Sequence, residues 1–188
     1  MESAQQILQS FIDRKQSPSV QYLLFNKDQV LFEFRSGLAN ITTNKPVNEQ
    51  TTSPLYSITK TFTALSIFQL MEAGKLDIKE KASKYLPGFP YDNSITISQL
   101  LTHSSGIPNP IPLRWIHLQE EHGDFDRDLF FKNIFNQNPK VKFSPGSRFA
   151  YSNLGYVLLG QIIEQVSGKQ LEQYFFDHII DPSGIDYH

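Results

Sequence analysis

Apolar positions near the start of the chain change from helical spacing to strict alternation. Residues 3–15 carry Ile, Leu and Phe three and four positions apart, which predicts an amphipathic helix that Ser17-Pro18 ends. Residues 20–25 and 30–35 then alternate on either side of Asn26-Lys27-Asp28. Such alternation around a short turn is typical of a β-hairpin.

After the hairpin the pattern becomes helical. Residues 36–53 are polar and rich in turn residues, so we expect an irregular connection there. From Ser57 an almost continuous apolar run leads to Gly74, which predicts a long helix that is buried nearly all round.

Start and stop signals mark the later helices. Thr96 followed by Gln99 matches a capping box, Asp126 is a candidate cap, and Gly168 is a typical terminator. We therefore expect helices at Thr96–Leu101, through Leu129–Phe135, through Leu154–Ile163 and through Leu171–Ile179, with a proline-rich loop at Ile107–Pro112. The pattern as a whole predicts the α+β class.

Composition excludes several functional classes. The 188 residues are 39% hydrophobic and 13% aromatic with a net charge of -2, which is typical of an ordinary globular protein without a footprint for nucleic acid or anionic membrane. We expect a small-molecule or peptide-like ligand. The absence of cysteine excludes thiol catalysis, and His117 and His122 lack a His-Glu-x-x-His pattern, so we expect no metal and no cofactor.

The first residues carry no export signal. No basic start and no apolar core follow Met1, and no stretch approaches the roughly 18 apolar residues of a membrane span. The sequence as written predicts a soluble, cytoplasmic protein. A mature periplasmic or secreted form would look the same, so that alternative stays open.

Ser57-Ile58-Thr59-Lys60 is the first candidate for chemistry. Residues three apart on a helix have Cβ atoms about 5–6 Å apart, so Lys60 can reach the Ser57 hydroxyl. A serine at a helix start also lies near the positive end of the helix dipole. About one Ser-x-x-Lys is expected by chance in such a chain, however, so an ordinary helix cap is the alternative.

Tyr151-Ser152-Asn153 is the second candidate. A phenol, a hydroxyl and an amide stand together just before a helix. Taken alone, the segment is also compatible with a helix cap beside a half-buried tyrosine.

Several segments occur together in one order. Ser57-Ile58-Thr59-Lys60 is followed by Leu100–Ile107, by Pro145-Gly146 leading to Tyr151-Ser152-Asn153, and by Asp181–Ile185. This order resembles the serine β-lactamase-like family, which includes class C β-lactamases, D-alanyl-D-alanine carboxypeptidases and esterases. The likeness runs from about the first hairpin to the end of the chain.

The resemblance implies an architecture. It makes residues 1–188 a single, partial domain of a two-lobed fold. Residues 1–40 would supply an N-terminal helix and hairpin, and residues 41–188 a mainly helical lobe that carries the active-site motifs.

The resemblance also implies roles. Ser57 would be the acylated nucleophile, and Lys60 would share its proton. Tyr151 would act with Lys60 as general base and return the proton to the leaving group, while Asn153 would orient the lysine and bind substrate. His103 matches a structural loop, so we expect it to pack and to form hydrogen bonds.

The family's third motif, Lys or His followed by Ser or Thr and Gly, is expected after Tyr151 and is absent from this sequence. We therefore expect the chain to be truncated before that strand, leaving the hairpin edge to be covered by a second chain or a missing segment. The strand would also supply one oxyanion-hole donor, whose loss typically costs about 10²–10³ in rate.

Two functions follow from these observations. The first is an active-serine hydrolase acting through an acyl-enzyme on a β-lactam, a D-amino-acid peptide or an ester. The alternative is a catalytically impaired or truncated relative that binds a ligand or partner without efficient turnover.

Overall fold

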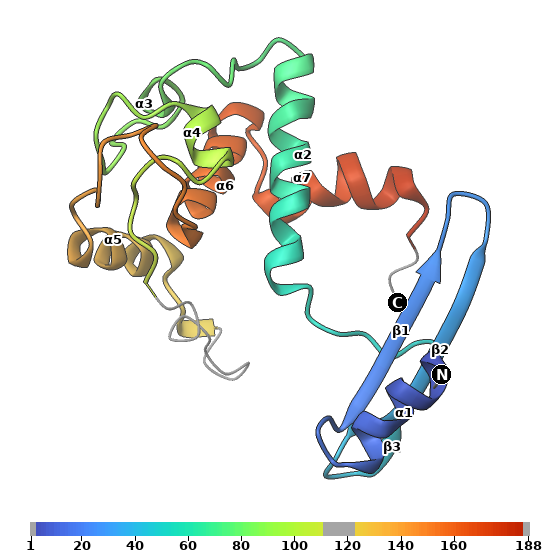
Figure 1. Cartoon of the computed structure of the whole chain (residues 1–188). Helices are drawn as coiled ribbons and strands as arrows, with labels where there is room; N and C mark the ends of the chain where they lie inside the picture. The colour runs from blue at the N-terminus through green and yellow to red at the C-terminus, as the bar shows by residue number, and fades with distance from the viewer. Residues whose placement is uncertain (1–2, 111–122, 186–188) are drawn as a thin grey trace. The chain divides into compact units, whose positions relative to one another are not determined.

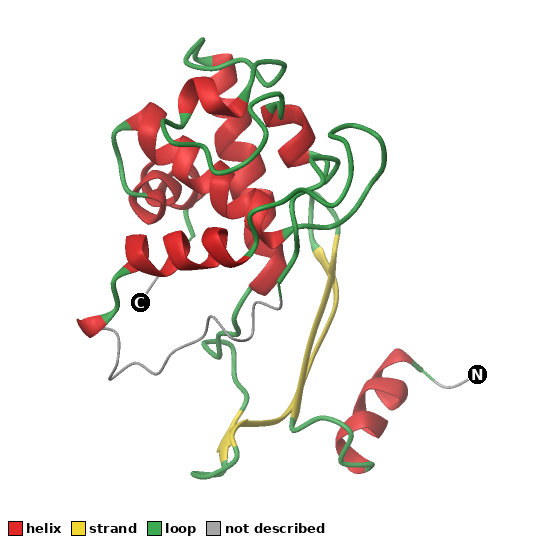
Figure 2. Ribbon diagram, turned by 90° about the vertical axis from the view of Figure 1, so that its left-hand side faces the viewer, coloured by secondary structure: helices red, strands yellow, loops and turns green. Residues whose placement is uncertain are grey.

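The chain forms two compact units. The computed structural model describes residues 3–110 and 123–185, and contacts divide the chain into Met1–Pro54 and Leu55–His188. Figures 1 and 2 show a helix with a β-hairpin in the first unit and gathered helices in the second. The predicted α+β class is confirmed, while the lobe boundary expected after residue 40 stays a prediction. His117, His122 and part of the proline-rich loop lie outside the described residues.

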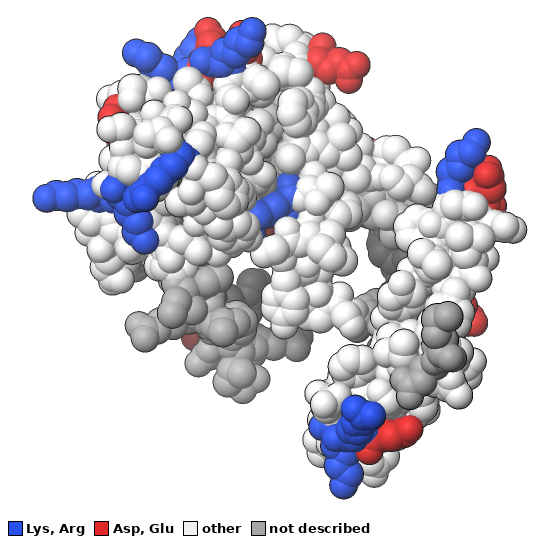
Figure 3. Space-filling view, in the orientation of Figure 1, with Lys and Arg blue, Asp and Glu red and all other residues white. Residues whose placement is uncertain are grey.

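Charged side chains of both signs are scattered over the visible face of the molecule, as Figure 3 shows. Dispersed charge along the sequence predicted this arrangement. In the part of the chain that the structure describes, no helix is both long enough and apolar enough to span a bilayer.

The first unit begins with the predicted helix, α1 (Ala4–Asp13). Ser3 caps it, and a reciprocal bond from Gln6 completes a capping box. The helix contacts both strands of the hairpin, and the Ser36 hydroxyl donates to the side-chain oxygen of Gln9 at 3.0 Å.

The predicted hairpin is also confirmed. Strands β1 (Ser19–Phe25) and β2 (Val30–Asn40) pair antiparallel. The side chain of Asn26 accepts the backbone N–H groups of Asp28 and Gln29 at 2.9 and 2.8 Å, which closes the turn between the strands.

One short strand was missed. Residues 36–53 were expected to be irregular, yet β3 (Lys45–Pro46) pairs with the end of β2 and completes a three-stranded sheet in the order β1-β2-β3. Two residues are too few to show an alternating pattern, so periodicity could not predict this strand.

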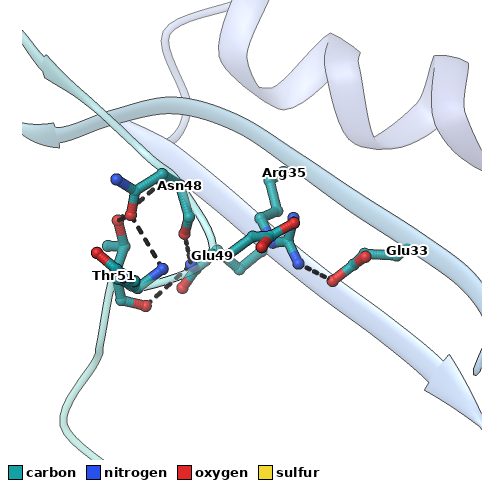
Figure 4. Close-up of polar contacts among 7 residues, drawn as sticks. Glu33, Arg35, Asn48, Glu49 and Thr51 are labelled. Atoms are coloured by element: carbon teal, nitrogen blue, oxygen red, sulfur yellow. Dashed lines mark hydrogen bonds and ion pairs between the residues drawn. The ribbon is translucent and has the colours of Figure 1, made fainter. Parts of the chain in front are cut away.

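Figure 4 shows how the segment after β3 is tied to the hairpin. Arg35 on β2 forms ion pairs with Glu33 and, at 3.4 Å, with Glu49. Gln21 on β1 donates to the backbone carbonyl of Thr51 at 3.1 Å. These contacts are solvent-exposed, so each ion pair contributes little stability, and together they fix the path of the chain.

The second unit is helical. Capping by Thr96, capping by Asp126 and termination at Gly168 are confirmed as predicted. The elements are η1 (Tyr56–Ile58), α2 (Thr59–Glu72), α3 (Ala82–Tyr85), α4 (Ile97–Leu101), α5 (Arg127–Gln137), α6 (Asn153–Ser167), α7 (Leu171–Phe175), η4 (Phe176–Ile180) and η5 (Asp181–Ser183).

Two of the helix predictions need correction. Ser57 was expected to open the long helix, but it lies in the 3-10 turn η1, and α2 begins two residues later. The last helix was expected to run on to Ile179, but α7 gives way to the π-helical η4 and the 3-10 turn η5. Pro182 in η5 has no backbone N–H, so the α-helical ladder cannot continue through it.

Helix α6 is the centre of the core. It contacts α2, α3, α4 and α7, and five of its apolar side chains are fully buried. Burial of each such side chain contributes about 1.5–3 kcal/mol. The fully buried side chains of α6 are Leu154, Leu158, Leu159, Ile162 and Ile163.

Helix α2 is covered on one face only, so the expectation of burial nearly all round is wrong. Its buried residues, Thr63, Ser66, Ile67 and Leu70, share one face. Leu65 and Phe68 on the other side are 45% and 43% exposed. The apolar run fixed the hydrophobicity of the helix, but the packing of α6 and α7 decided which face is covered.

We expect Leu158→Ala to lower the free energy of unfolding by about 2–5 kcal/mol, because it opens a cavity at a fully buried position. Leu65→Ala, at an exposed position of α2, should change it by about 0.5 kcal/mol or less. Urea denaturation followed by circular dichroism measures both values. Equal losses would contradict the placement of the core.

Candidate active site

Ser57 lies at the start of the helical unit, where the chain makes a tight turn into α2. The preceding Tyr56 has φ of +45°, a left-handed conformation that is rare for residues other than glycine. Backbone in such regions costs about 1–3 kcal/mol and is often found at functional sites. The turn presents the Ser57 side chain at the N-terminal end of α2, where the helix dipole is positive.

Three of the predicted side chains meet at this point. The Ser57 Oγ lies 2.9 Å from the Tyr151 hydroxyl, although the two residues are 94 positions apart. The Lys60 Nζ donates to the same Ser57 Oγ at 3.4 Å. Lys60 Nζ also lies 5.1 Å from the centroid of the Tyr151 ring. A hydroxyl nucleophile therefore has two groups within reach that can exchange its proton.

The environment of Tyr151 favours its ionised form. Burial acts to raise the pKa of its hydroxyl, but interactions with Lys60 and Ser57 outweigh burial and lower that pKa overall. The neighbouring Tyr156 differs, because burial and then the closeness of Tyr151 raise its pKa. Of the two phenols, Tyr151 is thus the one that ionises more readily to a phenolate, the form that can accept a proton.

Residues 103–109 hold the segment around Tyr151. The backbone N–H of Ala150 donates to the His103 carbonyl at 2.8 Å, and that of Ser152 donates to His103 Nδ1 at 3.2 Å. The Ser152 hydroxyl donates to the Pro108 carbonyl at 3.0 Å. We call residues 103–109 the cradle, because their contacts fix the backbone on both sides of Tyr151.

Ser152 links the cradle to α6. It is buried and is the N-cap of that helix, accepting from the backbone N–H of Gly155 at 3.1 Å. A single hydroxyl thus satisfies one free helix N–H while donating to the cradle.

Asn153 bonds to the cradle. Its backbone N–H and its side-chain Nδ2 both donate to Asn109 Oδ1, at 2.9 and 2.8 Å. The expected roles of Asn153 toward Lys60 and substrate stay predictions. Asn109 was missed by sequence reasoning, because it lies 44 positions from its partner and no local pattern links them.

A glycine allows the cradle to approach the loop before Tyr151. Gly106 has φ of +79°, and a Cβ there would lie 2.4 Å from the Phe143 carbonyl oxygen. The Gly106 carbonyl accepts the backbone N–H of Lys142 at 2.7 Å, and the Ser104 carbonyl accepts the backbone N–H of Gly146 at 2.8 Å. Only glycine fits this close contact between two backbones.

The site is open to solvent. Tyr151 is 37% exposed, and Ser57 is also exposed. A groove of about 820 Å³ lies elsewhere, between the loop after α3 and the helices α5 and α6, and none of the site residues lines it. Among residues 3–110 and 123–185, no three His, Cys, Asp or Glu side chains cluster as they would around a metal ion.

Comparison with known proteins gives consistent matches. The family model described as Beta-lactamase matches residues 4–187. Penicillin-binding protein 4* of Bacillus subtilis (strain 168) is 33% identical over 157 residues, which cover 84% of this chain and 34% of that protein. The chain therefore spans about a third of the length of this relative.

Solved structures share the fold. A D-amino acid amidase from Ochrobactrum anthropi SV3, complexed with L-phenylalanine, superposes with a TM-score of 0.80 at 26% identity, covering 96% of this chain and 48% of that one. An octameric penicillin-binding protein homologue from Pyrococcus abyssi superposes with a TM-score of 0.78 at 30% identity, covering 96% and 43%. The two units together thus correspond to part of a larger fold.

We expect Gly106→Ala to destabilise the protein more than Gly88→Ala. Both glycines have positive φ, and alanine in that conformation costs about 1–2 kcal/mol. A Cβ at Gly88 meets nothing within 4 Å, whereas at Gly106 it collides with backbone. Chemical denaturation of both variants measures the difference, and equal losses would mean that the cradle contact is unimportant.

Proposed function

The chain belongs to the Beta-lactamase family, and from that premise we propose that it is an active-serine hydrolase that forms an acyl-enzyme at Ser57. Its relatives include a D-amino acid amidase and penicillin-binding proteins. The observation that carries the proposal is the meeting of Ser57 Oγ with the Tyr151 hydroxyl at 2.9 Å and Lys60 Nζ at 3.4 Å.

The chemistry begins with removal of the Ser57 proton. Lys60 and Tyr151 take it up as a coupled pair, and the serine oxygen attacks the substrate carbonyl carbon. The carbonyl π electrons move onto oxygen and form a tetrahedral oxyanion. When the oxyanion collapses, the bond to the leaving group breaks, and the Tyr151 and Lys60 pair returns the proton to that group.

The second half of the reaction repeats these steps with water. The same pair removes a proton from water, the hydroxide oxygen attacks the acyl carbon, and Ser57 leaves with its proton restored. The start of α2 favours negative charge, and the Ser57 backbone N–H is the donor proposed to stabilise the oxyanion.

The substrate class is an acyl compound with a carbonyl that an exposed serine can reach: a β-lactam, a D-amino-acid peptide or amide, or an ester. The openness of the site places few limits on the size of this group. The same openness favours a second candidate function, a relative that acylates or binds a ligand without efficient turnover. Loss of one oxyanion-hole donor typically slows the reaction about 10²–10³-fold.

We expect the chain to gain the mass of the acyl group when incubated with a fluorescent penicillin, an activated ester or D-phenylalanine amide, because Ser57 is poised for attack. Intact-mass spectrometry detects the adduct. Ser57→Ala should abolish it, and Ser53→Ala, at another exposed serine of the same approach to α2, should not. The absence of both an adduct and a hydrolysis product with every reagent would contradict the hydrolase, and an adduct on Ser57→Ala would contradict the nucleophile.

We also propose that a strand from a second chain, or from a further segment of the protein, covers the free edge of β1. The hairpin exposes large apolar side chains, including Leu23, Phe25 and Val30 at 50%, 66% and 56%. Open strand edges with apolar side chains favour pairing with another strand.

We expect the outward-facing amides of β1 to exchange hydrogen rapidly in dilute solution, because no strand beyond β1 pairs with them in the described sheet. Hydrogen exchange at increasing protein concentration measures this. Protection that grows with concentration would identify a second copy as the occupant, whereas full protection in dilute solution would contradict a free edge.

A further inference from the structure

His103 occupies the centre of the contact between the cradle and Tyr151. Its ring centroid lies 4.5 Å from that of Tyr151 and 5.0 Å from that of Tyr156, each at an interplanar angle of 36°. The ring of Phe149 meets it edge-on at 5.8 Å. The imidazole is therefore packed directly against the phenol that reaches Ser57.

The hydrogen bonds of His103 define its protonation state. Its Nδ1 accepts the backbone N–H of Ser152 at 3.2 Å, so this nitrogen carries no hydrogen. The neutral ring then carries its hydrogen on Nε2. The backbone carbonyl of His103 also accepts the backbone N–H of Ala150 at 2.8 Å. His103 therefore holds both the residue before Tyr151 and the residue after it.

His103 also takes an unusual backbone conformation. Its φ is +55°, in the left-handed region, where residues other than glycine are uncommon. His103 lies just after the end of α4. In this conformation its carbonyl accepts from Ala150 and its ring accepts from Ser152. The surrounding contacts thus hold a strained residue in place.

Three titratable groups face His103. In the described chain these are Lys60 of α2, Tyr151, and Tyr156 of α6. Burial, and then the positive charge of Lys60, lower the pKa of the imidazole below its ordinary value. A proton on Nδ1 would also set the imidazole N–H against the backbone N–H of Ser152, so that two donors would face each other.

Resting on the proposed acylation at Ser57, we propose that His103 is a pH-sensitive positioning residue whose neutral imidazole holds Tyr151 at Ser57 and whose protonation at Nδ1 releases it. His103 touches no reacting atom and acts through Tyr151. A displacement of about 1 Å in a reacting group can cost about 10²-fold in rate, so loss of this support has a measurable effect.

The sign of the pH dependence follows from these contacts. Below the lowered pKa of His103, the neutral fraction falls about tenfold for each unit of pH, and acylation falls with it. The unfolded chain binds a proton on this histidine at higher pH than the folded chain does. Stability is therefore full above the ordinary histidine range and declines as pH falls toward the folded pKa.

Two variants separate the functions of the ring. In His103→Asn, the amide oxygen takes the place of Nδ1 as acceptor and does not titrate. His103→Phe keeps an aromatic ring against Tyr151 and removes the acceptor. Acylation rates are measured by intact mass with an activated ester between about pH 4.5 and pH 8, which brackets histidine titration.

We expect the wild-type rate to fall about tenfold per pH unit on the acid side. The ratio of the wild-type rate to the His103→Asn rate should fall about tenfold per pH unit below the His103 pKa, because the Lys60 and Tyr151 pair titrates in both proteins and the asparagine does not. His103→Phe should be slower than wild type by about tenfold or more at neutral pH and should approach the wild-type rate at acid pH. An acid limb in His103→Asn like that of wild type, or a wild-type rate at neutral pH in His103→Phe, would overturn the proposal.

A second measurement does not depend on acylation. Nuclear magnetic resonance of nitrogen-labelled protein, with the His103 signals assigned by difference from His103→Asn, should show hydrogen on Nε2 and a Ser152 amide signal that shifts as His103 titrates. Hydrogen on Nδ1, or a Ser152 signal that ignores the titration, would overturn the inference. If these signals behave as expected while no variant is acylated, the proposed hydrolase fails and the positioning contact stands.

Discussion

The position of Tyr151 depends on a set of backbone hydrogen bonds between two loops far apart in sequence. Residues 103–109 accept from Ala150, Ser152 and Asn153 and so fix the chain on both sides of the tyrosine. Gly106 permits the approach, since any larger residue would collide with the Phe143 carbonyl. Without this contact the phenol would have no fixed place beside Ser57, and the serine would have only Lys60 as a neighbour.

The contact is supported by the core of the helical unit. Helix α6 begins at the Ser152 cap and packs against both α2, which follows Ser57, and α4, which precedes the cradle. The three parts of the site are therefore attached to elements that share one buried core. A rigid scaffold of this kind holds reacting groups near 3 Å apart at little further entropic cost.

The same structure leaves apolar surface exposed at defined places. One face of α2 carries Leu65 and Phe68 in solvent, and the hairpin presents further large apolar residues. The Beta-lactamase model matches residues 4–187 of the chain, which spans about a third of the length of the Bacillus relative. Exposed apolar faces are expected where a protein contacts further surface, and this agrees with the proposal that another strand completes the sheet.

The sequence by itself determined the local features. Helical spacing, alternation and capping residues predicted α1, the hairpin, α4, α5 and α6, because each signal lies within one turn or one strand pair. Ser57 and Lys60 were identified for the same reason, since three residues of helix bring them together. The order of motifs supplied the family, and with it Tyr151.

Only the tertiary structure decided what lies across long separations. It showed that Asn153 bonds to Asn109, that one face of α2 is uncovered, and that His103 bonds to the backbone beside Tyr151. The two hydrogen bonds join residues 44 and 49 positions apart, and Ser57 meets Tyr151 across 94 positions. Hydrophobic pattern and spacing describe each element separately, whereas such contacts depend on how elements pack, and many sequences with the same pattern would pack differently.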